Sequence, residues 1–182
     1  MGAVADFFVE ADQLFGLHFD IGMSFAISRK RLETLQREHG MNDESPFMFA
    51  DRSPTELPEV EMERSLHSTS LGALKQRIAD PGFDLVQSAH SIVVFVYHLW
   101  DERFRGLLAR ERNVASRSIQ IDVFGDLRLI RNSLIHNRGI AATAVAKCKV
   151  ITRFKPGDRI EFTKLDIHDL VRELRRALTP YA

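Results

Sequence analysis

The sequence lacks several features that mark common classes of protein. Its 182 residues include a single cysteine, Cys148, so no internal disulfide is possible. No run of about 18 apolar residues occurs, so we expect no membrane-spanning helix. An acid interrupts the first apolar run, and no basic segment precedes it, so we expect no signal peptide. These absences predict a cytoplasmic protein without a membrane partner.

The sequence also lacks the common motifs for binding phosphates and metals. Neither the GxG nor the GxxxxGK pattern of phosphate-binding loops is present. His90 and His98 are two helical turns apart, which is too far for one metal ion, and no cysteine or carboxylate cluster completes a site. We therefore expect no metal site and no cofactor.

The composition fits one globular domain, residues 1–182. Hydrophobic residues make up 45% of the chain and charged residues 27%, which allows a buried core and a soluble surface. The net charge is zero, but residues 1–96 carry about −7 and residues 97–182 about +7. The basic half either binds polyanions or is simply a solvated surface, and charge alone does not decide between them.

Apolar residues recur at helical spacing through most of the chain. Gly16 and Gly22 weaken the first helix, and Gly40 is a plausible C-terminal stop. Serines at 116 and 118 are candidate caps for the helix that runs to about residue 136. The predicted organisation is an N-terminal helical segment over 1–40, a long loop over 41–58, a shorter helix over 59–79, and core helices over 84–139 that consist of helix 84–112 and the motif helix.

The pattern changes near the C-terminus. Residues 146–164 alternate between apolar and polar around Lys155-Pro156-Gly157-Asp158, which predicts a β-hairpin with Cys148 on its inward face. An amphipathic helix over 165–179 follows. The predicted fold is therefore mainly α, a helical bundle with a small C-terminal β-hairpin and a terminal helix.

The helix that ends near residue 136 carries three polar groups in an apolar pattern. Arg131 falls inside the apolar arc, and Asn132 and His136 lie together on its edge. Burying an unpaired guanidinium is costly, so Arg131 needs a carboxylate, an opening to water or an anionic ligand. The carboxylates available for an ion pair are Asp101, Glu102 and Asp126.

The stretch RNSLIH, residues 131–136, resembles the signature of the HEPN superfamily: an arginine, a polar residue that is often asparagine, three residues, and a histidine. The preceding helix with YHLWDERFRG and the C-terminal region also look like some branches of the superfamily. The resemblance covers roughly residues 84–178. It implies a compact HEPN-like helical bundle with the motif late in a long helix.

The resemblance also implies a function. Many HEPN domains are metal-independent endoribonucleases of bacterial toxins, phage-defence systems or RNA-processing factors, and they act as homodimers whose motifs face each other. Here Arg131 would stabilise phosphorane charge, His136 would be the general acid or base, and Asn132 would orient the phosphate or the histidine. Attack by the ribose 2′-hydroxyl would restrict cleavage to RNA, so no DNA specificity is expected.

Further residues and partners follow from this interpretation. Glu102 is a candidate partner of Arg131, and Arg103 and Arg138 are candidate phosphate contacts. A cognate antitoxin or regulatory protein is a possible partner. One toxin branch has a nucleotidylated tyrosine just after the histidine, whereas Asn137 follows here, so that regulation is not expected.

Two other interpretations remain open from the sequence. The chain could be a non-catalytic HEPN module that binds a nucleotide or a protein. It could also be an unrelated helical protein in which Arg131 forms a buried ion pair. Arg131 and His136 sealed from solvent, with Arg131 saturated by carboxylates, would favour the non-catalytic module. A strict monomer would favour the unrelated helical protein.

Overall fold

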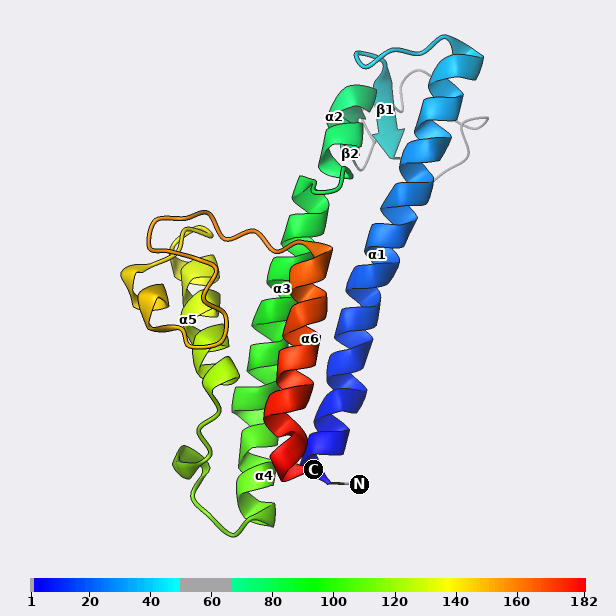
Figure 1. Ribbon diagram of the computed structural model, residues 1–182. Helices are drawn as coiled ribbons and strands as arrows, with labels where there is room; N and C mark the ends of the chain where they lie inside the picture. The colour runs from blue at the N-terminus through cyan, green and yellow to red at the C-terminus, as the bar shows by residue number, and fades with distance from the viewer. Residues whose placement is uncertain (1, 50–66) are drawn as a thin grey trace. The chain divides into compact units, whose positions relative to one another are not determined.

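The computed structural model describes residues 2–49 and 67–182, and these are mainly helical (Figure 1). The chain divides into two compact units, Met1–Ile21 with Val86–Ala182, and Gly22–Leu85. Among the described residues, no helix combines the length and apolar character that a membrane span requires. The prediction of a mainly helical fold is therefore confirmed.

The first helix, α1, runs over Ala3–His39 and confirms the predicted helical segment over 1–40. Gly16 and Gly22 do not break it. Gly40 follows with a φ of 63°, a left-handed conformation that glycine adopts without strain, and it ends the helix as predicted.

A long helical run confirms the helix predicted over 84–112. It consists of α3 over Phe83–Leu99, a π-helical turn, η3, over Trp100–Phe104, and α4 over Arg105–Glu111. The Trp100 ring stacks on Phe124 with centroids 4.0 Å apart, and Phe7 packs edge-on against both rings. This aromatic group joins the run to α1 and α5 in the core of the larger unit.

The motif helix, α5, runs over Asp122–His136. Its end agrees with the prediction, but its start is later than the serines that were expected to cap it. Ser116–Ser118 instead forms a separate short 3-10 helix, η4. Ile121 holds the N-cap position in extended conformation and makes no side-chain capping bond.

The predicted β-hairpin over 146–164 is wrong. Its first arm contains a short 3-10 helix, η5, over Thr143–Lys147, and continues without a strand. The buried Asp126 carboxylate accepts the backbone N–H groups of Lys149 at 2.9 and 3.0 Å, Val150 at 2.6 Å and Ile151 at 2.8 Å. Because these amides bind a side chain, they are not available for a β-ladder.

The predicted turn over Lys155–Asp158 is present, closed by the Asp158 N–H donating to the Lys155 carbonyl at 3.0 Å. The chain then pairs with the segment after α5, since the Ile160 N–H donates to the Gly139 carbonyl at 2.8 Å. One isolated bridge, Ile140 with Arg159, marks this pairing. The alternation in the sequence therefore arises from a segment that packs on the core, not from a hairpin.

The terminal helix predicted over 165–179 is confirmed as α6, Lys164–Leu178. Thr163 and Asp166 form a capping box at its start, in which each side chain binds the other residue's backbone N–H. Arg175 on this helix pairs with Asp12 on α1 at 2.7 Å. A last 3-10 turn, η6, covers Thr179–Tyr181.

The smaller unit contains the two-stranded antiparallel sheet of the structure. β1, Pro46–Phe49, pairs with β2, His67–Ser70, and α2 covers Leu71–Arg77. The predicted loop over 41–58 thus includes a strand, while its residues 50–58 lie outside the described part. The helix predicted over 59–79 is only α2 here, preceded by a strand, and its residues 59–66 also lie outside the described part.

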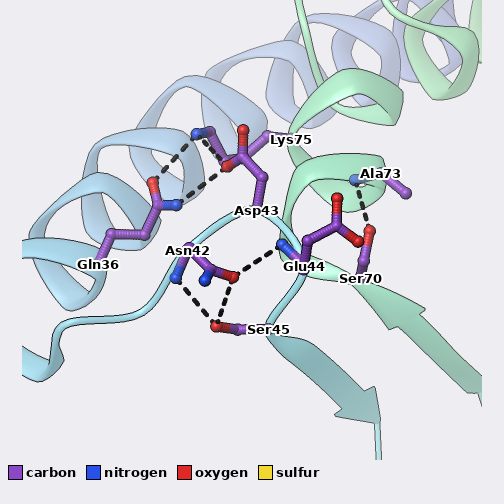
Figure 2. Close-up of polar contacts among 8 residues, drawn as sticks. All are labelled: Gln36, Asn42, Asp43, Glu44, Ser45, Ser70, Ala73 and Lys75. Atoms are coloured by element: carbon purple, nitrogen blue, oxygen red, sulfur yellow. Dashed lines mark hydrogen bonds and ion pairs between the residues drawn. The ribbon is translucent and has the colours of Figure 1, made fainter.

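Polar contacts hold the end of α1 to α2 within the smaller unit (Figure 2). Lys75 Nζ donates to Asp43 at 3.1 Å and to Gln36 at 3.0 Å, and Gln36 also donates to Asp43 at 3.0 Å. A Cβ on Gly72 would lie 2.8 Å from that of Asp43, so only glycine allows this approach. Each group in the cluster is satisfied by a neighbour, which indicates a structural role.

Candidate functional site

The three motif residues lie on the last two turns of α5. Asn132 and His136 are exposed, and Arg131 is half-buried. Ile135 stands between them along the helix with 46% of its surface exposed. At 100° per residue, these four side chains form one continuous face. The end of α5 therefore presents a cation, an amide and an imidazole around an exposed apolar residue.

Arg131 has no carboxylate partner among the described residues. Its Nη1 donates to Asn132 Oδ1 at 3.3 Å, while its Nε is buried and unbonded. Arg131 is only half-buried, and its hydrogen bond to Asn132 lies at the exposed surface. The guanidinium can thus still take an anionic ligand.

The carboxylates considered as partners of Arg131 are engaged elsewhere or unpaired. Asp126 binds the amides that follow η5. Asp101 accepts from Arg105 at 3.4 Å and from the Tyr97 hydroxyl. Glu102 is exposed, and within the described ranges no hydrogen bond or ion pair joins it to Arg131. No ion pair with a carboxylate of the described residues therefore explains the arginine.

The end of α5 is held by buried polar groups that sequence reasoning did not single out. Ser133 is fully buried, donates to the Leu129 carbonyl at 3.1 Å and accepts the Ala142 N–H at 3.0 Å. Gly139, with a φ of 77°, turns the chain and donates to the Ser133 carbonyl at 3.2 Å. These contacts fix the last turn that carries His136.

His90 supports the same region from α3. Its Nε2 donates to the Ile160 carbonyl at 2.7 Å, and Ile160 in turn binds Gly139. Desolvation by burial lowers the pKa of His90, which keeps the ring neutral. His90 therefore has a structural role in this region.

Cys148 lies against the Asp126 carboxylate. Burial, and then the nearby negative charge, raise the pKa of Cys148 to about 12. A neutral thiol is a poor nucleophile and a poor metal ligand. The geometry thus favours the packing role that the sequence suggested.

Three further predicted residues are not joined to Arg131 by any hydrogen bond or ion pair in the described part of the chain. Arg103 pairs with Glu10, and together with Glu102 it lines an open surface hollow of about 530 Å³ that also includes Arg110. Arg138 is exposed, directly after the motif, with a φ of 52°. Their roles as partner or phosphate contacts stay predictions.

A second hollow, of about 580 Å³, lies between the α3–α4 run and the first half of α5. We call it the α5 hollow and define it by Tyr97, Asp101, Arg105, Gly125 and Arg128. Arg128 is one helical turn before Asn132, so this lining residue lies on the helix face that carries the motif. Only the three-dimensional packing of α3 on α5 shows this, because no motif joins the two stretches.

The described residues include no group of three or more histidine, cysteine, aspartate or glutamate side chains placed to hold a metal ion. Comparison of the chain with family models, with curated proteins and with solved structures gives no match. Any functional assignment therefore depends on the chemistry of the α5 face itself.

Proposed function

We propose that this chain is a metal-independent endoribonuclease of the HEPN type that cleaves RNA through Arg131 and His136. One observation carries the proposal: Arg131 lies half-buried beside exposed Asn132 and His136 with no carboxylate partner in the described residues. A structural arginine in an apolar stripe would be paired. An arginine that binds a phosphate of a substrate would instead lack a carboxylate partner in the free protein, as Arg131 does among the described residues.

The proposed reaction is transfer of a phosphodiester to the adjacent ribose 2′-hydroxyl. A histidine removes the 2′-hydroxyl proton, the oxygen attacks phosphorus, and the bond from phosphorus to the 5′-oxygen breaks. A second histidine protonates that leaving oxygen. The products are a 2′,3′-cyclic phosphate and a 5′-hydroxyl, and no metal ion is needed to balance the step.

Arg131 would bind the non-bridging oxygens as charge develops on them, and its fork of donors suits a phosphate. Asn132 already bonds to Arg131 and would hold its orientation. Because each chain supplies a single His136, the two proton transfers favour a homodimer. Exposed Ile135, between the two functional residues, would pack at the centre of that interface.

The test compares the parent protein with Arg131→Ala and His136→Ala on total RNA in the presence of a chelator. Matched controls are Arg172→Ala and His168→Ala, which remove the same residue types from exposed positions on α6. We expect cleavage by the parent and the controls, and a loss of about 100-fold or more in both site variants. Products should carry 5′-hydroxyl ends.

Other outcomes would assign a different function. RNA binding without cleavage would indicate a non-catalytic binding module. Identical RNA patterns for the parent and both site variants would remove the nuclease proposal.

A further inference from the structure

We infer that the α5 hollow binds one nucleotide of the RNA strand next to the scissile phosphate, which makes it the substrate subsite of the proposed nuclease. This inference rests on the proposed function. The α5 hollow has a volume of about 580 Å³, which lies within the range of roughly 300–1,000 Å³ that small-molecule sites occupy. Its lining residue Arg128 is on the motif-bearing face of α5, one turn from Asn132.

One wall of the hollow offers groups that suit a base and a sugar. The Tyr97 hydroxyl and the Asp101 carboxylate bind each other at this wall. Burial, and then the Asp101 charge, raise the pKa of Tyr97, so its hydroxyl stays a donor. The Asp101 carboxylate has further acceptor capacity for amino or ring N–H groups of a base.

The opposite wall offers a free positive charge. Arg128 is exposed and makes no hydrogen bond or ion pair with other residues of the described ranges. The other charges are already engaged: Arg105 donates to the Ser116 carbonyl at 3.0 Å and to Asp101, while Asp122 pairs with Lys149 at 2.8 Å. Arg128 is thus the cation lining the hollow that remains available to bind a phosphate.

The spacing along α5 fits a strand that follows the helix. Arg128 and Asn132 are separated by one turn, a rise of about 6 Å. Successive phosphates of an extended strand could therefore meet Arg128 and then the pair of Arg131 and Asn132. The base of the nucleotide whose phosphate meets Arg128 would enter the hollow, which lies along the first half of α5.

Gly125 leaves the space open. It lies on α5 at the wall of the hollow, and a Cβ built on it meets nothing within 4 Å. A leucine at this position would therefore extend from an unobstructed Cβ toward the hollow. Glycine is less favourable in a helix than leucine or alanine, so replacing it should not unfold α5.

The experiment measures binding of a 2′-O-methyl oligoribonucleotide, which cannot be cleaved, by fluorescence anisotropy. The variants are Gly125→Leu, which fills the hollow, Gly125→Ala, which does not, and Arg128→Gln. Gly16→Leu is the matched control, because Gly16 is also a helical glycine whose Cβ meets nothing within 4 Å. Thermal melting and cleavage of the natural RNA are measured on every variant.

We expect Gly125→Leu and Arg128→Gln to weaken oligonucleotide binding at least about 10-fold. The melting temperature of both variants should stay within a few degrees of that of the parent. Gly125→Ala and Gly16→Leu should bind as the parent does. Cleavage by the parent with unchanged binding in Gly125→Leu overturns the subsite and leaves the nuclease proposal standing. Binding lost in Gly125→Leu when the parent does not cleave removes the nuclease and keeps a nucleotide site. A parent that neither binds nor cleaves overturns both.

Discussion

The buried carboxylate of Asp126 accepts the backbone N–H of Val150 at 2.6 Å, which ties the segment after η5 to the helix that carries the motif. With 3% of its surface exposed, Asp126 also accepts the amides on either side of Val150. Asp126→Ala should lower the free energy of unfolding by about 3 kcal/mol, since it leaves several amides without an acceptor. Urea denaturation measures the loss.

Asp122→Ala is the matched control for that prediction. Asp122 is on the same helix, but its pair with Lys149 is exposed, so its removal should cost less than about 1 kcal/mol. Equal losses in the two variants would show that the Asp126 contacts do not hold the segment.

The stability of the protein should fall as the solution is acidified, in part through His90. Burial lowers the pKa of His90, so the unfolded chain binds a proton more readily than the folded one. The His90 contribution is therefore fully present above about pH 6.5, the ordinary value for histidine, and is lost progressively below it. Melting temperatures between about pH 7.5 and pH 5.5 should decrease less steeply in His90→Gln than in the parent. His168→Gln, which changes an exposed histidine, is the control and should keep the parent's dependence of melting temperature on pH. The same dependence in His90→Gln would assign the acid sensitivity to other groups.

Ile135→Glu should separate the proposed homodimer into monomers and abolish RNA cleavage, because it places a charge at the centre of the interface. The variant should fold normally, since the side chain is 46% exposed. Light scattering gives the mass, and Ile135→Leu is the control that keeps both the dimer and the activity. A dimer that survives Ile135→Glu would place the interface elsewhere.

Cys148→Ser should cleave RNA at the parent rate. The pKa of the Cys148 thiol, raised to about 12 by burial and by Asp126, keeps it protonated at neutral pH, and no step of the proposed reaction uses it. The parent thiol should also react slowly with iodoacetamide at pH 7 in the folded state. Loss of activity in the serine variant with unchanged melting would give the cysteine a direct role.

The helical part of the fold follows closely from local sequence signals. The apolar spacing predicted α1, the α3–α4 run, α5 and α6, and Gly40 marked the end of α1 through its left-handed backbone. Neither Gly16 nor Gly22 interrupts α1, since a glycine costs a helix only about 1 kcal/mol.

The β-hairpin predicted over 146–164 is absent because a contact between distant residues overrides the local sequence pattern. Alternation over 146–164 is the pattern of a strand, but the three successive amides of residues 149–151 bind Asp126, which is about 24 residues earlier in the chain. Asp126 appeared in the sequence only as a possible partner of Arg131. The strand β1 was missed for a similar reason, since its partner is the later strand β2 and not an adjacent segment.

The candidate site divides in the same way. The spacing of Arg131, Asn132 and His136 on one helix could be predicted, because it depends on helical periodicity alone. The α5 hollow could not, because Asp101 and Arg128 meet only through the packing of α3 and its extension on α5. Supporting groups such as Ser133 and His90 carry no sequence signal that separates them from ordinary core residues.

The most direct test of the central claim uses a DNA oligonucleotide that contains one ribonucleotide, incubated with the protein in a chelator. The account predicts a single cut on the 3′ side of the ribonucleotide, with a cyclic phosphate and a 5′-hydroxyl as products, and no cut by Arg131→Ala or His136→Ala. A cut at deoxyribonucleotide positions, or one that the two variants make as well as the parent, would contradict it.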